Sequence, residues 1–214
     1  MIDLLRVCKS LPHPKLETLA DRMYMMGPRD GNKKVLVLDM DETMLHARFI
    51  ENEAQRSKDD GDFFFALQSQ QSGSKDVQGT PSESMMISIK LRPMLDMALD
   101  FLANFYEIVV FTAGTQDYAD AALDFIDPER LIIRHRLYRQ HCVNAAPGVY
   151  VKDLRVFQDR DIKDIVLVDN SILSFAFQMD NGIPIKAYMR QEDDEELLYM
   201  VSFLEEVFTV ADPR

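Results

Sequence analysis

Two aspartates and a threonine stand at every second position after a short apolar run. The run is Val35–Leu38, and the polar residues are Asp39, Asp41 and Thr43. Such a run is typical of a strand buried on both faces, and alternate side chains beyond its end point the same way. Paired carboxylates there suit a hard cation such as Mg²⁺, which takes oxygen ligands and usually binds a substrate phosphate. The spacing favours a phosphate-handling site, although Asp and Thr also cap helices and close turns.

Three further strand-like segments deliver polar residues of the kinds that bind phosphate. They are Ile108–Phe111 with Thr112, Tyr150–Leu154 with Lys152, and Ile165–Val168 with Asp169 and Asn170. Thr112 precedes small residues that let backbone N–H groups approach an anion, and Lys152 supplies a compact positive charge. Because ligands of open α/β sheets bind beyond the carboxyl ends of the strands, we expect one shared crevice. Taken singly, each residue has an ordinary alternative as a surface lysine, a helix cap or a turn.

At these residues the chain resembles the haloacid dehalogenase superfamily. Within it, the chain is most similar to the FCP/SCP-type phosphatases of the RNA polymerase II C-terminal domain, also called NLI-interacting-factor-like phosphatases. The resemblance covers roughly residues 33–214. The segments that carry it are Leu38–His46, Leu91–Pro93, Tyr106–Ala113, Arg136–Arg139, Tyr150–Leu154 and Val168–Ser171. The chain departs from the family pattern at Met40, Leu91 and Gly114, of which the last two bear on specificity rather than chemistry.

The resemblance implies an α/β fold of the haloacid-dehalogenase (Rossmannoid) type, a parallel sheet flanked by helices with a small β-type insert and no large cap. We expect residues 1–32 to be an N-terminal extension packed on the domain, because Pro and Gly interrupt any long helix there. The phosphatase domain would span 33–214, with the insert at about 47–90. Within the insert, 68–84 is rich in Gln, Ser and Gly and is predicted to be a flexible loop.

Apolar residues recur at helical spacing in three segments. They are Leu95–Phe105 after Pro93, Tyr118–Phe125, and Leu197–Phe208. Strands that alternate with such helices indicate βαβ units and a parallel sheet. The five acidic residues at 192–196 come at the start of the last helix, where negative charge suits the helix dipole.

The resemblance also implies a role for each polar residue. Asp39 would attack phosphorus and form an aspartyl-phosphate. Asp41 would protonate the leaving alkoxide and then deprotonate the attacking water. Mg²⁺ would be held by the Asp39 carboxylate, the Asp41 main-chain carbonyl and Asn170, with Asp169 alongside. The residues that would hold phosphoryl oxygens are Thr43, Thr112 and Lys152.

The sequence indicates the residues that contact the substrate less clearly than it indicates the catalytic residues. Arg139 aligns with a family arginine and is the expected substrate contact. In the resembled family the insert supplies an apolar pocket for the substrate peptide. Strand alternation would put Phe63 and Phe65 on one face, where they either line that pocket or pack the insert onto the domain.

Composition narrows the functional classes. The chain has 214 residues, 47% of them hydrophobic, which can bury one sizeable core. A net charge of −12 argues against direct nucleic-acid binding. No apolar run approaches the ~20 residues of a membrane span, no signal-peptide pattern is present, and the two cysteines fit a reducing compartment. We therefore expect a soluble intracellular protein of the nucleus or cytoplasm.

Three functions remain open. The first is a Mg²⁺-dependent phosphatase of phosphoserine or phosphothreonine proteins, for which the RNA polymerase II C-terminal domain is the substrate that the resemblance implies. The second is a small-metabolite phosphatase. Such enzymes of the superfamily usually carry a cap, for which the roughly 40 residues between Thr112 and Lys152 leave little room. The third is a non-catalytic phosphopeptide-binding scaffold, which the intact acidic motif disfavours.

Overall fold

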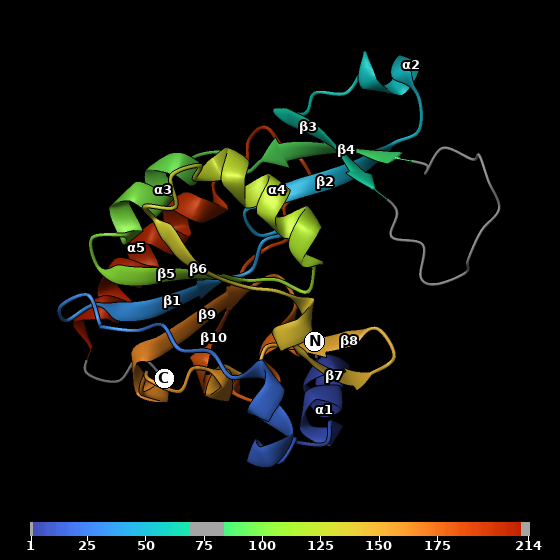
Figure 1. Cartoon of the computed structure of the whole chain (residues 1–214). Helices are drawn as coiled ribbons and strands as arrows, with labels where there is room; N and C mark the ends of the chain where they lie inside the picture. The colour runs from blue at the N-terminus through green and yellow to red at the C-terminus, as the bar shows by residue number, and fades with distance from the viewer. Residues whose placement is uncertain (1, 69–83, 211–214) are drawn as a thin grey trace.

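A five-stranded parallel sheet forms the centre of the computed structural model, which describes residues 2–68 and 84–210 (Figure 1). Its strands are β1 (Lys34–Leu38), β5 (Tyr106–Phe111), β6 (Ile133–Leu137), β9 (Ile165–Asp169) and β10 (Gly182–Pro184). Their order in the sheet is β10-β9-β1-β5-β6. Strand β1 pairs with β5 on one side and with β9 on the other, so the strand order reverses beside it. This parallel sheet confirms the predicted α/β fold. Ligands of open α/β sheets bind where the strand order reverses, which here is the carboxyl end of β1.

The two faces of the sheet are covered differently. Leu36 and Leu38 of β1 point into a core with three helices, while Val35 and Val37 point into a second core on the opposite face. The helices are α3 (Leu95–Leu102), α4 (Gln116–Ile126) and α5 (Glu196–Thr209). The opposite face is covered by short 3-10 turns rather than by long helices. These turns are η1 (Leu16–Arg22), η2 (Arg139–His141), η3 (Leu154–Val156), η4 (Ile162–Asp164), η5 (Ile172–Phe175) and η6 (Met179–Asn181).

A small antiparallel sheet extends from the carboxyl end of β1 (Figure 1). Its strands are β2 (Leu45–Ile50), β3 (Phe63–Gln68) and β4 (Ser84–Leu91), in the order β2-β4-β3, with the short helix α2 (Glu53–Arg56) between β2 and β3. The two β-like segments predicted in the insert are strands, and β2 adds a third. The predicted flexible loop 68–84 lies outside the described residues except for its two end positions, which close β3 and β4.

The lysine segment is not part of the main sheet. Strands β7 (Val143–Ala146) and β8 (Val149–Val151) form a separate two-stranded sheet, and Lys152 directly follows β8. The backbone N–H of Lys152 donates to the carbonyl of Ser174 at 2.7 Å, which ties this segment to the turn that follows β9. The lysine thus reaches the same edge of the main sheet from a neighbouring hairpin.

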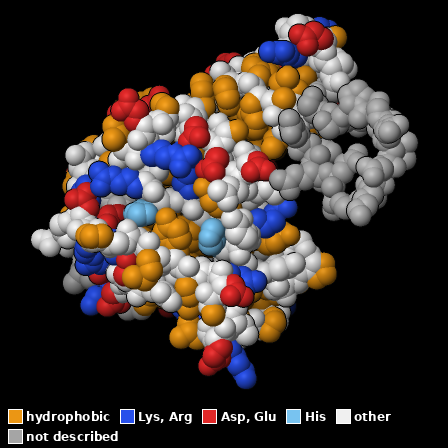
Figure 2. Space-filling model, viewed as in Figure 1, with side chains coloured by type: hydrophobic (Ala, Val, Ile, Leu, Met, Phe, Trp, Pro, Cys, Tyr) orange, Lys and Arg blue, Asp and Glu red, His pale blue; other side chains and the backbone are white. Residues whose placement is uncertain are grey.

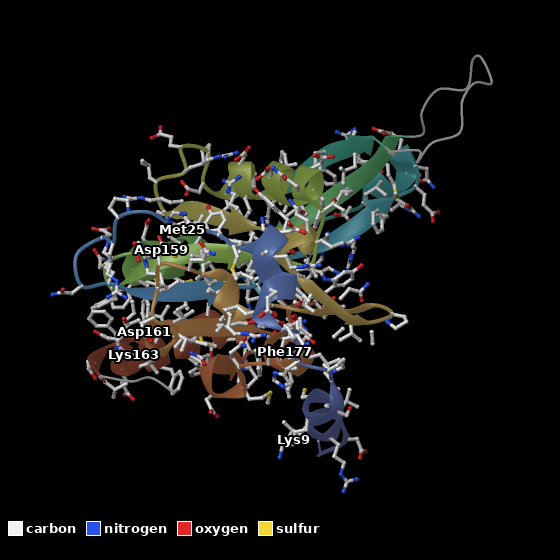
Figure 3. The ribbon with its side chains drawn as sticks, turned by 60° about the horizontal axis from the view of Figure 1, so that its bottom comes forward. Lys9, Met25, Asp159, Asp161, Lys163 and Phe177 are labelled. Atoms are coloured by element: carbon white, nitrogen blue, oxygen red, sulfur yellow. The ribbon has the colours of Figure 1, made fainter. Side chains whose placement is uncertain are left out.

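The N-terminal segment packs on the domain through helix α1 (Ile2–Ser10) and η1. Cys8 and Leu11 are buried in a cluster with Phe177, and the rings of His13 and Phe177 lie 4.8 Å apart. In Figure 3, Lys9 lies on α1 at the outer edge of the molecule and Phe177 lies near that helix. Both cysteines of the described residues are free thiols.

The exposed surface is mixed in charge. Figure 2 shows one face, on which acidic, basic and apolar side chains are interspersed and apolar ones gather over α4 and the small sheet. Within residues 2–68 and 84–210, no helix is long and apolar enough to cross a bilayer.

Candidate active site

A cavity of about 670 Å³ opens beyond the carboxyl ends of the central strands. The predicted residues that line it are Asp39, Asp41, Thr112, Arg139, Lys152, Asp169 and Asn170. They come from the last residue of β9, from the segments after β1, β5, β8 and β9, and from η2. The expectation that these side chains share one crevice agrees with this geometry, although their chemical roles stay predictions.

Lys152 joins two carboxylates at the base of the cavity. Its Nζ donates to Asp39 Oδ1 at 2.5 Å and to Asp169 Oδ2 at 2.6 Å, and all three side chains are nearly buried. Burial alone would lower the pKa of Lys152, but the two carboxylates raise it above its usual range, so the lysine stays protonated. Burial, together with the charge of Asp169, raises the pKa of Asp39 to about 7 despite the lysine. Additional positive charge would stabilise the ionised Asp39.

Thr43 forms a buried hydrogen bond with the carboxylate of Asp39. Its hydroxyl donates to Asp39 Oδ2 at 3.0 Å, and the residue is 1% exposed. Thr43 was predicted to hold a phosphoryl oxygen, but it is not among the residues that line the cavity. The hydroxyl of Thr43 orients the carboxylate of Asp39, and its role in holding a phosphoryl oxygen stays a prediction.

Asp41 receives a hydrogen bond at each carboxylate oxygen. The Tyr118 hydroxyl donates to Oδ1, and the Thr112 hydroxyl lies 3.5 Å from Oδ2. Burial raises the pKa of Asp41 above its usual range, although the Tyr118 hydrogen bond opposes that shift. Sequence reasoning missed Tyr118, because it was assigned to the apolar stripe of α4. The only feature of the sequence that could have indicated a polar role for Tyr118 was its phenolic hydroxyl.

Asn170 is held from the loop after β1. Its Nδ2 donates to Glu42 Oε2 at 3.0 Å. The neighbouring Asp169 is fixed as well, since its Oδ1 accepts from the backbone N–H of Ser171 at 2.7 Å. Glu42 also lines the cavity, and sequence reasoning gave it no role.

The donor atoms around Asp39 fit a hard divalent cation. Carboxylate, amide and main-chain carbonyl oxygens are the ligands that Mg²⁺ and Ca²⁺ prefer. The described residues contain no cluster of three or more His, Cys, Asp or Glu side chains placed to hold a metal. The predicted ligand set differs from such a cluster, because it draws on the Asp41 carbonyl and the Asn170 amide. A cation beside Asp39 would offset the burial that raises the pKa of that carboxyl.

Part of the apolar lining of the cavity comes from the small sheet, and the predicted Phe63 and Phe65 are not in it. Phe63 and Phe65 do share one face, with their rings stacked 5.5 Å apart. However, helix α4 covers that part of the strand, so Phe63 stacks on Phe125 at 4.5 Å and Phe65 on Tyr118 at 6.1 Å. Neither is among the residues that line the cavity, and their role as substrate-binding residues stays a prediction. The apolar lining residues of this sheet are Ala47, Phe49, Leu67, Met85 and Ile87.

Arg139 lines the opposite side of the cavity. Its Nε donates to the carbonyl of Ala113 at 2.6 Å, and its guanidinium lies 5.3 Å from the centre of the Tyr150 ring. The side chain is thereby held close to the segment that follows β5. Its role as a substrate contact stays a prediction.

A buried ion pair fixes the loop that carries both aspartates. Arg92 donates to both oxygens of Asp194, at 2.7 and 2.9 Å, and to the carbonyl of Thr43 at 3.0 Å. The Arg92 side chain is fully buried and that of Asp194 is 4% exposed. Asp194 belongs to the acidic stretch before α5. Besides placing negative charge near the start of α5, this stretch therefore supplies the carboxylate that binds Arg92.

Proteins named as phosphatases are similar to this chain in sequence. "CTD small phosphatase-like protein 3" of Caenorhabditis elegans is 37% identical over 210 residues, covering 97% of this chain and 66% of the relative. "CTD small phosphatase-like protein 2" of Dictyostelium discoideum is 45% identical over 125 residues, covering 58% of this chain and 22% of the relative. The chain therefore spans less than two thirds of the length of either relative.

One solved structure supports the fold. "The Structure of Fcp1, an essential RNA polymerase II CTD phosphatase" matches with a TM-score of 0.63 at 17% identity, over 83% of this chain and 62% of that one. The family model described as "NLI interacting factor-like phosphatase" matches residues 34–214. The chain belongs to the NLI interacting factor-like phosphatase family, within the haloacid dehalogenase superfamily.

Proposed function

We propose that this protein is a Mg²⁺-dependent phosphatase of phosphoserine and phosphothreonine proteins that works through an aspartyl-phosphate on Asp39. One observation carries the proposal. Asp39, held by Lys152, and Asp41, held by Tyr118, face one cavity as two carboxylates in different environments. Two such carboxylates suit the separate roles of nucleophile and general acid.

In the first step, a carboxylate oxygen of Asp39 attacks phosphorus and the bond from phosphorus to the serine or threonine oxygen breaks. Lys152 and Thr112 hold phosphoryl oxygens, where negative charge develops in the transition state. Asp41 gives its proton to the departing alkoxide. The raised pKa of Asp41 supports this role, because an acid must carry its proton near neutral pH.

In the second step, water attacks the phosphorus of the aspartyl-phosphate and the oxygen of Asp39 leaves as a carboxylate. Asp41, now ionised, takes the proton of that water. The hydrogen bond from Tyr118 stabilises the ionised form between the two steps, while the single hydroxyl proton of Thr112 stays on the phosphoryl group. Asp41 thus returns to its starting state.

The metal would be held by Asp39, the Asp41 carbonyl and Asn170, with Asp169 alongside. Bound Mg²⁺ would neutralise charge between the anionic nucleophile and the phosphate. Lys152 would supply the remaining positive charge in the same space.

A peptide is the substrate class that the cavity favours. Beside the catalytic residues it presents an apolar wall that includes Leu67 and Ile87, which suits the side chain of a residue next to the phosphoresidue. The relatives named as CTD small phosphatases, together with the solved structure titled as an RNA polymerase II CTD phosphatase, make the RNA polymerase II C-terminal domain the first candidate. A small phosphorylated metabolite would leave that apolar wall unused.

Two substrate panels test the proposal. Wild-type protein and Asp39→Asn would be assayed for phosphate release with phosphoserine and phosphothreonine peptides, including C-terminal-domain repeats, and with phosphorylated metabolites. We expect hydrolysis of peptides in preference to metabolites by wild-type protein and none by Asp39→Asn. Preference for metabolites would support the alternative enzyme class. Peptide binding by wild-type protein without hydrolysis would indicate a scaffold instead.

A further inference from the structure

Glu42 stands beside the two aspartates with a left-handed backbone. Its φ angle is 63°, a region that residues with a Cβ seldom adopt and that glycine and asparagine adopt more easily. Non-glycine residues in such conformations cluster at functional sites, where the surrounding structure holds them in place. Glu42 is also one of the residues that line the catalytic cavity.

Hydrogen bonds from two other segments hold this backbone. The N–H of Glu42 donates to the carbonyl of Leu45 at 2.7 Å, and its carbonyl accepts from the N–H of Tyr188 at 2.8 Å. The Tyr188 hydroxyl in turn donates to the carbonyl of Leu91 at 3.0 Å. The fold therefore imposes the turn, and a glycine would satisfy the same backbone bonds with less strain.

The side chain explains why a glutamate is useful at this position. An ionised carboxylate can only accept hydrogen bonds, so the Asn170 atom 3.0 Å from Glu42 Oε2 must be the amide nitrogen. The amide oxygen of Asn170 is then directed away from Glu42. That oxygen is the atom a hard cation would bind.

We propose that Glu42 is a positioning residue for the divalent-cation site, which holds the Asn170 amide with its oxygen available to the cation. This inference rests on the proposed function and deepens it. Groups that orient metal ligands through hydrogen bonds typically contribute 10–100-fold to metal affinity. The strained turn brings the glutamate within reach of Asn170.

A purely structural role for Glu42 predicts a different effect of Glu42→Gly on cation affinity. If Glu42 served only the turn, Glu42→Gly would relieve the left-handed strain and leave cation affinity unchanged. If Glu42 positions Asn170, the same change raises thermal stability without metal and weakens the cation site. In that case the melting temperature without metal rises while the affinity for the cation falls.

The test measures Mg²⁺ binding directly on the full chain, by titration calorimetry and by the Mg²⁺-dependent shift of the melting temperature. The variants are Glu42→Gln, Glu42→Gly and, as a matched control, Glu205→Gln on the exposed side of α5. We expect Glu42→Gly to bind Mg²⁺ about 10–100-fold more weakly and to melt a few degrees higher without metal. Glu42→Gln, whose amide oxygen can still accept the Asn170 hydrogen bond, should lose less affinity. Glu205→Gln should match wild type in both measurements.

A double-mutant cycle with Asn170→Ala identifies the partner. If Glu42 acts through Asn170, adding Glu42→Gly to Asn170→Ala costs little further affinity. A full additional loss in that background would overturn the assignment to Asn170, and a folded Glu42→Gly protein with wild-type Mg²⁺ affinity would overturn the inference altogether.

The proposed function and this inference fail in different ways. A wild-type protein that neither binds Mg²⁺ nor hydrolyses phosphopeptides overturns both. A wild-type protein that does both, with Glu42 variants that bind Mg²⁺ equally well, overturns the inference alone.

Discussion

The hydroxyl of Tyr118 on α4 donates a hydrogen bond to Oδ1 of Asp41, from 77 positions further along the chain. The ring of Tyr118 stacks on Phe65 of the small sheet, 6.1 Å between centres. The candidate acid is therefore oriented by a helix that itself packs on the insert. We expect the hydroxyl, and not only the ring, to matter for proton transfer.

Tyr118→Phe should slow the hydrolysis of phosphoserine peptides about tenfold while sparing aryl phosphates with acidic leaving groups. An acidic leaving group departs without a proton, so the orientation of Asp41 matters less. Steady-state kcat and KM would be measured for both substrate types. Tyr106→Phe is the matched control, because it removes a buried hydroxyl bonded to Leu204 at 2.7 Å, far from the cavity. Equal losses on both substrates would show that Tyr118 is structural.

Asp39→Asn should abolish turnover of every phosphoester and leave phosphopeptide binding largely intact, because an amide is a poor nucleophile. Asp41→Asn should retain more activity on activated aryl phosphates than on alkyl ones, because it removes only the proton donor. Phosphate release and peptide binding would be measured for both variants. Near-normal turnover by Asp39→Asn would refute its assignment as nucleophile.

Removal of divalent metal should eliminate activity, and Mg²⁺ should restore it. Ca²⁺ should substitute poorly, since its longer and looser coordination would misplace the phosphate relative to Asp39. The measurement is aryl-phosphate hydrolysis after exhaustive dialysis against a chelator, followed by titration with each cation. Activity that persists after chelation would point to a different phosphatase chemistry.

Leu67→Ala should raise KM for phosphopeptides about tenfold and spare a small aryl phosphate, because an apolar pocket contact is worth about 1–3 kcal/mol. Phe63→Ala is the comparison from the same face of the same strand. It should instead lower the free energy of unfolding by about 2–3 kcal/mol through its lost stacking on Phe125, since the ring is only partly buried. A selective KM effect of Phe63→Ala with none of Leu67→Ala would instead support the sequence-based prediction that Phe63 contacts the substrate.

Asp194→Ala should lower the free energy of unfolding by about 3–5 kcal/mol, because it leaves the buried guanidinium of Arg92 without its carboxylate. Asp193→Ala, an exposed neighbour, should change it by less than about 0.5 kcal/mol. Urea denaturation would measure both. Similar small effects for the two variants would show that the ion pair is replaceable by water or other acceptors.

Sequence alone determined the features that follow from local periodicity. The apolar run of β1 and the alternation after it placed Asp39 and Asp41 on one edge of a sheet, because side chains of an extended chain alternate with period two. The same rule correctly put Phe63 and Phe65 on a common face. Family motifs added Lys152 and Asp169, whose segments reach that edge.

Tertiary structure decided which of these side chains meet. Periodicity gives the face of a strand but not where a helix lands on it, so it could not show that α4 covers Phe63 and leaves Leu67 at the cavity. The contacts of Tyr118 with Asp41 and of Glu42 with Asn170 likewise join segments far apart in the chain. Such contacts depend on how the whole domain packs, and no local pattern of residues encodes them.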